Sequence, residues 1–325
     1  MTNADQPEQR AGAPPRIHCL GVIVLDALSG PLSGYPVRPG QTQIVTKQVR
    51  FAAGGGAANT ACALARMGLG ACVFSKLGDD FAGRYLLDEL RASGVDTRGI
   101  CVSATDATPF TFVGVHADGD RTFIHTPGAN LTFSPDDLDR VRLLDCDFLL
   151  YQDLWVKPRL DGEAGAAILA EARRRGAVTM LDECFGLGPD RRQLEVMLPH
   201  CDYFVPSLDD MRVVYPGASA EDVAARVLAG GAGAVVLKMG AQGCLVARRG
   251  GGRRHVPAFP TDVVDTTGAG DCWDAGFLAA LAHGEDVFAA AVTGNAAARF
   301  CIRAVGGSAG VPSYAEVRRL AESAG

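Results

Sequence analysis

The segment from Asp265 to Asp271, with the sequence DTTGAGD, places two carboxylates around a glycine-rich turn. Apolar residues recur at helical spacing over residues 273–281, so the turn should open a helix. The free N–H groups and the dipole at a helix N-terminus form an anion site. Because like charges repel, we expect Asp271 to accept a proton from a substrate hydroxyl instead of binding a phosphate itself. Three residues would surround the phosphoryl group with backbone N–H groups: Gly268, Ala269 and Gly270.

Two further polar residues follow apolar or glycine-rich runs near the N-terminus. Residues 17–25 form an apolar run that predicts a buried strand, with Asp26 at its C-terminal end. Glycines 54–56 then open an Ala-rich helix with Asn59 near its start. Sugar hydroxyls need acceptors and donors in pairs, which Asp26 and Asn59 would provide. Both residues also have a structural interpretation, because a carboxylate can close a turn and an amide can cap a helix.

The spacing of strands and helices predicts the scaffold that would position these residues. From residue 145 onward, short apolar strands alternate with helical stretches, which is typical of a parallel, doubly wound α/β sheet. Such sheets bind ligands beyond the C-terminal ends of their strands. Small strands at about 29–51 and 108–127 break the alternation, so we place them in a separate β-sheet lid. Residues 1–16 are polar and predict a disordered tail, which leaves residues 17–325 as one domain.

The string DTTGAGD resembles the C-terminal signature of the ribokinase-like (PfkB) carbohydrate kinases. The segment 54–68, followed by Gly78-Asp79, is similar to the N-terminal glycine-rich signature of that family. Both signatures occur in family order, and the resemblance covers roughly residues 17–315. It implies a ribokinase-like fold, which is one large α/β domain with a small β lid. It also implies phosphorylation of a sugar hydroxyl, with ATP as the phosphoryl donor and Mg²⁺ as its partner.

The resemblance further implies a role for individual residues. It makes Asp271 the general base, in agreement with the chemistry expected at a helix N-terminus. It assigns substrate hydroxyls to Asp26, Gly55 and Asn59, the nucleotide to Lys238, Gly240, Gly243 and Asn295, and a monovalent cation to Asp265.

The chain departs from the family pattern at several positions. Many members carry N-x-x-E where this chain has Ser207 and Asp210. We keep Ser207 as a nucleotide contact and Asp210 as a ligand of Mg²⁺ through water. Gly310 stands where some potassium-dependent members have a hydroxyl residue, which leaves activation by K⁺ open. Asp153 corresponds to a family glutamate or similar residue, and we expect it to contact the substrate.

Four further features have both a functional and a structural interpretation. Arg121 lies in a predicted hairpin arm and could reach the substrate or be a solvated charge. Trp155 could stack on a sugar or a base, or belong to the core. Asp182 ends a predicted strand on the ligand side of the sheet. An exposed lid face would suit a homodimer.

Composition excludes several classes of partner. The net charge is −6 and no basic stripe occurs, so nucleic acid is not expected. No apolar run reaches the length of a membrane span, and residues 1–16 do not resemble a secretory signal. The ten cysteines include no C-x-x-C pair and lie mostly in apolar runs. We expect reduced, buried thiols and a cytoplasmic location.

Other functions stay open to different degrees. A nucleoside kinase of the same fold would need aromatic residues around Asp26 to sandwich a base, and segment 26–60 has only Tyr35 and Phe51. A dinucleotide-dependent oxidoreductase would need G-x-G-x-x-G after the first strand, and a P-loop enzyme would need a Walker A string; the sequence has neither. A binding protein without activity would not need Asp271 and its glycines.

Overall fold

Nine strands form the central sheet of the protein, whose computed structural model describes residues 14–32, 40, 42, 44–45, 49–116, 121–184 and 188–323. The strand order is β13-β12-β11-β10-β9-β8-β1-β4-β5. All neighbours from β11 to β5 are parallel, and β12 and β13 add an antiparallel edge. The prediction of a doubly wound, mostly parallel sheet is confirmed. The strands are β1 (Ile17–Leu20), β4 (Ala71–Gly78), β5 (Asp96–Ser103), β8 (Phe148–Leu154), β9 (Val178–Glu183), β10 (Tyr203–Phe204), β11 (Ala234–Lys238), β12 (Cys244–Arg248) and β13 (Arg253–Val256).

Helices cover both faces of this sheet and bury two separate apolar clusters. One face carries α1 (Gly56–Arg66), α2 (Phe81–Ala92), α8 (Ala269–Ala282), α9 (Val287–Cys301) and α10 (Tyr314–Glu322). The other carries α3 (Arg140–Leu143), α4 (Glu163–Arg174), α5 (Arg191–Met197), α6 (Leu208–Val214) and α7 (Ala220–Ala229). Helix α8 is apolar all round and buried from residue 272 to 282, so its N-terminus has a fixed position.

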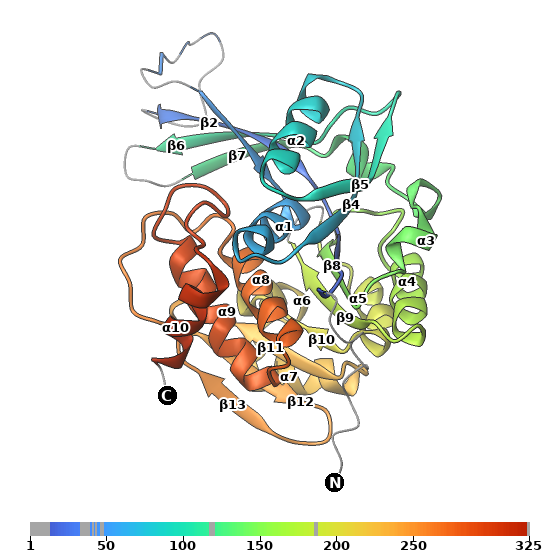
Figure 1. Ribbon diagram of the computed structural model, residues 1–325, viewed down its shortest axis with the longest axis vertical. Coiled ribbons are helices and arrows are strands. Elements are labelled where there is room, and N and C mark those ends of the chain that lie inside the picture. The colour runs from blue at the N-terminus through green and yellow to red at the C-terminus, as the bar shows by residue number, and fades with distance from the viewer. Residues whose placement is uncertain are drawn as a thin grey trace.

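A separate four-stranded sheet forms the lid. Its order is β3-β2-β6-β7, and Figure 1 shows β2, β6 and β7 projecting past the end of the large sheet near α1. The predicted small sheet is therefore present. Parts of the predicted lid segments, residues 33–39, 41, 43, 46–48 and 117–120, lie outside the described residues. The strands are β2 (Val24–Leu32), β3 (Arg50–Gly54), β6 (Phe110–His116) and β7 (Arg121–Thr126).

The prediction of one strand over residues 17–25 is wrong. The chain forms β1 in the large sheet, leaves it after Leu20 and enters the lid as β2 at Val24. The N–H group of Gly21 still bonds Phe74 of the large sheet, whereas the N–H group of Leu25 bonds Pro109 at the start of β6. Both strands are buried and apolar, so hydrophobicity does not mark the change of sheet. Asp26 consequently lies inside a lid strand.

Two sequence expectations concern membranes and cysteines. Across the described ranges, no helix is long and apolar enough to cross a membrane. All ten cysteines lie in those ranges as free thiols, and eight of them are buried. Of the predicted tail, residues 1–13 lie outside the description, and the N–H group of Arg16 bonds the carboxylate of Asp147 at 2.8 Å.

Candidate active site

The turn before α8 has the geometry that an anion site needs. Gly268 is the N-cap residue and adopts the left-handed conformation with φ 72°. A Cβ at this position would also overlap the carbonyl oxygen of Gly307, so only glycine fits. The N–H group of Ala269 bonds the carbonyl of Thr266 at 3.2 Å, which removes it from the predicted set of free donors. The N–H groups of Gly270 and Asp271 belong to the first turn, where helix geometry provides no acceptor within the helix.

Asp271 lies in this first turn beside the N-terminus of α1. Its carboxylate accepts a hydrogen bond from Nδ2 of Asn59 at 2.8 Å, and its carbonyl accepts one from Thr60 at 3.0 Å. Gln152 on β8 donates to the Thr60 hydroxyl at 2.8 Å. Two helix N-termini from the two sequence signatures therefore meet at Asp271. Gly307 packs against the Asn59 amide so closely that a Cβ there would overlap it.

The electrostatic surroundings hold the pKa of Asp271 above its ordinary value. Burial raises this pKa, the hydrogen bond from Asn59 lowers it, and the negative charge of Asp182 raises it. A carboxylate of raised pKa is a stronger base than an exposed one. The arrangement can therefore accept a proton from a hydroxyl placed against it.

Asp153, which the sequence analysis expects to contact the substrate, is a buried residue. Its carboxylate accepts hydrogen bonds from the N–H groups of Val22 at 2.8 Å and Gly56 at 3.2 Å, and its side chain is 5% exposed. Burial raises its pKa to about 7, with the Lys157 charge acting in the opposite direction. Asp153 holds the passage from β1 to the lid against the start of α1.

A lysine and two carboxylates lie directly beneath the anion turn. Nζ of Lys238 contacts Asp182 at 3.0 Å and Asp274 at 3.2 Å. A Cβ at Gly270 would lie 3.4 Å from this Nζ, which shows how close the ammonium group is to the turn. Although burial lowers it, the pKa of Lys238 is raised above its ordinary value by Asp182 and Asp274. Lys238 is therefore a permanent positive charge beside the predicted phosphoryl site.

The segment that the sequence assigns to the nucleotide borders a cavity of about 610 Å³. Gly240 and Gly243 form a tight turn with φ 55° and 86° after β11, and the neighbouring Met239 and Gln242 line the cavity. Its other walls come from α6, α7 and the end of β13, including Arg212, Glu221, His255 and Pro257. A volume of this size suits a small-molecule ligand.

Asn295 does not line this cavity. It is 7% exposed, accepts a hydrogen bond from the Trp273 indole at 2.8 Å, and donates to the carbonyls of Val256 and Pro257. Its amide therefore fixes the wall that Pro257 contributes. Its assignment to the nucleotide stays a prediction.

Ser207 and Asp210, which stand in place of the N-x-x-E pattern, cap the N-terminus of α6. The N–H group of Asp210 donates to the Ser207 hydroxyl at 3.1 Å, and that hydroxyl donates to the Asp210 carboxylate at 2.9 Å. Glu183, which the sequence analysis did not identify, accepts from the Ser207 N–H group at 2.8 Å. Its second oxygen, Oε2, is buried without a hydrogen-bond partner among the described residues. Burial and the charge of Asp182 raise the pKa of Glu183 well above its ordinary value.

An orphaned carboxylate oxygen fits a cation ligand. Mg²⁺ in phosphoryl-transfer sites is bound by one or two carboxylates, with phosphates and waters completing its coordination. Glu183 and Asp210 offer that donor set at the start of α6, the helix whose Leu208 and Arg212 line the cavity. No cluster of three or more metal-ligating side chains occurs within the described ranges.

Asp265 connects the two segments that flank the anion turn. Its carboxylate accepts hydrogen bonds from the N–H groups of Thr267 at 2.8 Å and Gly306 at 3.0 Å. The side chain is 4% exposed. Its assignment to a monovalent cation stays a prediction.

Of the predicted lid residues, the structure describes Asp26 and Gly55, whereas it describes only the backbone of Arg121. Asp26 pairs with Ala52 of β3 and Thr111 of β6, and its carboxylate lies against Gly54. Gly55 caps α1 with φ 90°. The Arg121 side chain lies outside the described residues, although its backbone belongs to β7.

The structure decides between the two interpretations of Trp155, and it adds residues that the sequence analysis missed. Trp155 is 3% exposed and its indole donates to the Asp190 carbonyl, so it belongs to the core. Glu183, Asp274 and Gly307 surround the site without having been predicted. Asp274 follows Asp271 by one helical turn, and Glu183 follows Asp182 at a strand end, so both signals were present in the sequence.

Several known proteins are similar to this chain in sequence or in fold. A ribokinase of Staphylococcus aureus (strain COL) is 28% identical over 293 residues, which cover 87% of this chain and 92% of that protein. A ribokinase of Arabidopsis thaliana, solved in complex with ribose and ATP, superposes with a TM-score of 0.82 at 22% identity, over 95% of this chain and 99% of that one. A putative ribokinase II of E. coli, solved with ATP and Mg²⁺, gives a TM-score of 0.78 at 24% identity, over 95% and 99% of the two chains.

The two solved structures establish the shared fold, and the family model extends the likeness to the sequence itself. Residues 20–313 match the model described as pfkB family carbohydrate kinase. The match spans both glycine signatures, the lid and the anion turn. This chain therefore belongs to the pfkB family of carbohydrate kinases.

Proposed function

We propose that this kinase transfers the γ-phosphoryl group of ATP to a hydroxyl, most simply a primary hydroxymethyl group, of a small sugar-like substrate, with Asp271 as the general base. The observation that carries the proposal is the position of the Asp271 carboxylate. It lies in the first turn of α8, 2.8 Å from Asn59 and beside the N–H group of Gly270. A base and an anion site thus share one helix end.

The roles of the chain's own groups follow from this position. Asp271 takes the hydroxyl proton as the oxygen forms its bond to the γ-phosphorus of ATP and the bond to the leaving oxygen of ADP breaks. The attacking and leaving oxygens are in line, and no phosphoenzyme forms. The N–H groups of the turn and the Lys238 ammonium group face the charge that develops on the phosphoryl oxygens. Closure of the lid over the substrate would exclude water and limit ATP hydrolysis.

We assign the nucleotide to the cavity beside Gly240 and Gly243, whose wall includes Met239, the residue that follows Lys238. Glu183 and Asp210 would hold Mg²⁺, directly or through water. When bound, Mg²⁺ neutralises charge on the β- and γ-phosphates. Ser207 supports this site by fixing both carboxylates.

The lid register favours a sugar over a nucleoside. The residues directly across the lid from Asp26 are Ala52, Thr111 and His125, and Thr111 hydrogen-bonds the His125 ring at 3.0 Å. These side chains offer hydroxyl and imidazole groups to sugar hydroxyls. Phe51 pairs with Ala27, so it points to the opposite face and cannot sandwich a base against Asp26.

That opposite face supports a homodimer through the lid. The residues in register with Ala27 are Phe51, Phe112 and Ile124, and the side chains of Phe51 and Ile124 are 44% and 50% exposed. A second copy would cover this apolar face. Light scattering should give twice the mass of the chain, and Ile124→Asp should give the monomer mass. A wild-type monomer at micromolar concentration would refute the dimer.

The catalytic proposal is tested by ADP release from ATP with Mg²⁺, with and without K⁺, against ketoses, aldoses, sugar acids, inositols and nucleosides. We expect turnover with a sugar and a loss of about 10²–10⁴ in kcat for Asp271→Asn, the range of a general base. The Kd for ADP, measured by calorimetry, should stay within about twofold of the wild-type value, because the proposed role of Asp271 does not involve the adenine ring.

Three results would change the proposal. Near-normal turnover by the Asp271→Asn protein would remove Asp271 as the base. Turnover with nucleosides alone would make the protein a nucleoside kinase. A difference of less than about twofold between assays with and without K⁺ would remove the cation assigned to Asp265.

The free thiols fit a reducing compartment, so we also propose a cytoplasmic location.

A further inference from the structure

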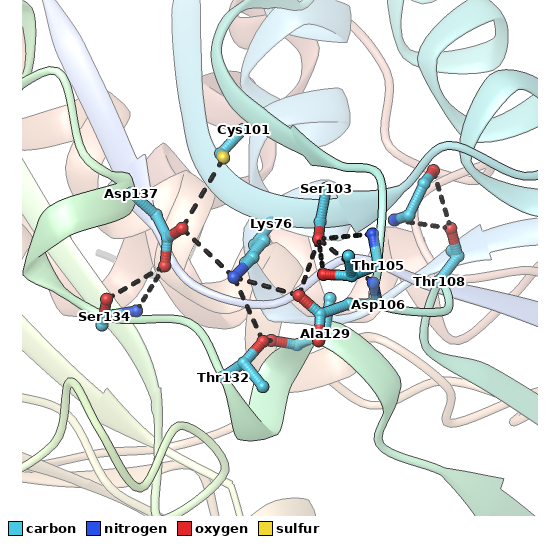
Figure 2. A network of polar contacts seen from close by, with 11 residues as sticks. Lys76, Cys101, Ser103, Thr105, Asp106, Thr108, Ala129, Thr132, Ser134 and Asp137 are labelled. Carbon is cyan, nitrogen blue, oxygen red and sulfur yellow. Dashed lines mark hydrogen bonds and ion pairs between the residues drawn. The ribbon is translucent and has the colours of Figure 1, made fainter.

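The segment from Lys76 to Asp80, which includes the Gly78-Asp79 pair at the end of the N-terminal signature, has no assigned role in the catalytic site. Lys76 lies on β4 and is only 8% exposed, although lysine is seldom buried without partners. Its Nζ contacts Asp106 at 3.1 Å and Asp137 at 3.1 Å, and donates a hydrogen bond to Thr132 at 3.1 Å. Figure 2 shows these three side chains converging on the one ammonium group.

The partners of Lys76 belong to the two connections of the lid hairpin, which is formed by β6 and β7. Asp106 lies in residues 104–109, which lead from β5 into β6. Thr132 and Asp137 lie in residues 127–139, which lead from β7 back to the large domain through the short 3₁₀ helices η1 (Gly128–Leu131) and η2 (Pro135–Asp137). One residue of the large sheet therefore holds the hairpin at both of its ends.

Asp80 makes a second attachment four residues later. Its carboxylate accepts hydrogen bonds from the N–H group of Thr108 at 2.8 Å and from the Thr108 hydroxyl at 2.7 Å. The same carboxylate caps α2 through Gly83 at 2.8 Å. The two connections also bond each other, because the N–H group of Ala129 donates to the Ala107 carbonyl at 2.8 Å.

These attachments lie close to Asp26, the lid residue that is proposed to bind the sugar. Pro109, which directly follows Thr108, accepts a hydrogen bond from the N–H group of Leu25 at 3.0 Å. Leu25 precedes Asp26, and Asp26 pairs with Thr111 on β6. The position of β6 therefore sets the position of Asp26. A shift of the connection at 104–109 would reach Asp26 through two backbone steps.

The charges at Lys76 make this attachment firm. The two carboxylates need the ammonium group between them, and secondary donors hold each of them in place: Ser103 for Asp106 at 2.7 Å and the Ser134 N–H group for Asp137 at 2.9 Å. The Asp106 and Asp137 side chains are each 18% exposed, so the cluster is partly buried. Removing one member of a partly buried ion cluster leaves the others less well compensated, and partial burial reduces the screening of these contacts by salt.

We infer that Lys76 is a positioning residue that fixes the β6–β7 hairpin, and with it Asp26, relative to the large sheet that carries Asp271. The inference rests on the proposed function for its catalytic consequence, and on the contacts alone for its structural one. It gives the Lys76–Asp80 segment a task distinct from ligand binding.

The structural consequence is measured by hydrogen–deuterium exchange of the ligand-free protein, which needs no substrate. In Lys76→Gln, the amides of residues 110–116 and 121–126 should exchange at least about tenfold faster, while those of α8 keep their wild-type rates. Asp106→Asn releases only the connection before β6 and keeps the Lys76–Asp137 contact, so it tests the same point if Lys76→Gln does not fold. Arg318→Gln is the control: Arg318 lies on the distant helix α10, its substitution removes contacts with Glu285 and Glu322, and it should leave the hairpin unchanged.

The catalytic consequence is measured with D-ribose and with D-fructose as probes. In Lys76→Gln we expect KM for the accepted sugar to rise about tenfold, with the Kd for ADP within about twofold of the wild type. Faster exchange throughout the chain, or an unchanged hairpin in the folded variant, would overturn the inference. So would a loosened hairpin with an unchanged sugar KM. If the wild type phosphorylates no sugar, the proposed function fails, and the exchange rates still decide whether Lys76 fixes the hairpin.

Discussion

The anion turn and the lid are built in opposite ways. In the turn, Gly268 and Asp271 are close in sequence, and a single helix end positions the N–H groups and the base. In the lid, the neighbours of Asp26 come from β3, β6 and β7, which are distant in sequence. The turn is anchored by the buried helix α8, whereas the connections of the lid hairpin are anchored by individual side chains such as Lys76 and Asp80.

This difference separates two parts of the proposed reaction. Phosphoryl transfer depends on backbone geometry that one short segment specifies. Choice of sugar depends on side chains that come together only when four lid strands pair in register. Substitutions in the turn should therefore act on kcat, and substitutions in the lid on the KM of the sugar.

The largest contrast is expected between Asp271→Asn and Asp26→Asn. The first should lower kcat as described above. On the proposed function, the second weakens a hydrogen bond from a sugar hydroxyl to a charged acceptor, a contact that would form in the ground state and be kept in the transition state. Such bonds contribute about 1.5–3 kcal/mol, so the sugar KM should rise about 10- to 100-fold while kcat and the KM of ATP stay near wild type. Steady-state kinetics with both substrates varied separate these effects.

A matched control for this contrast is Asp88→Asn on α2. The Asp88 side chain is 81% exposed and forms a surface ion pair with Arg91 at 3.5 Å, so the substitution removes the same charge without touching the site. It should leave both KM values unchanged. If Asp26→Asn lowered kcat and left the sugar KM alone, the division of labour between turn and lid would be wrong.

The sequence predicted the turn well because its signals are local. A glycine with positive φ, an acidic first turn and an apolar helix lie within about twenty consecutive positions, so residue types alone indicate the helix end and Asp271. The start of α1 near Asn59 was predicted for the same reason, since a glycine run and an Ala-rich helix mark it. The contact between Asn59 and Asp271 required the fold, because it joins two helices from opposite ends of the chain.

Other features could not be predicted because they depend on which sheet a strand joins. The runs at β1 and β2 are both apolar, so the periodicity could not show that Asp26 lies in the lid. Asn295 looked like a ligand contact, yet its amide is used by Val256 and Pro257. Lys76 carries no sequence signal for its role, since its partners lie on two separate connections.

The smallest effect concerns the pH dependence that Asn59 gives to Asp271. Transfer needs ionised Asp271, so kcat/KM should fall as the pH falls through the pKa of this carboxyl, which burial raises above its ordinary value. The hydrogen bond from Asn59 stabilises the anion and lowers that pKa. Asn59→Ala removes this donor, so the pKa should rise and the acid limb should move to higher pH. The profile of kcat/KM for ATP, measured from about pH 5 to 8, reports it.

Thr60→Ala is the control for this shift, because Thr60 donates to the carbonyl of Asp271 and not to its carboxylate. Both variants disturb the junction of α1 and α8, so each is expected to lower the rate somewhat. Only Asn59→Ala should move the acid limb. If the two variants shifted the limb equally, packing at the junction would set the pKa of Asp271. If neither variant shifted the limb, the group that titrates in the profile would not be Asp271, and the profile would not support Asp271 as the general base.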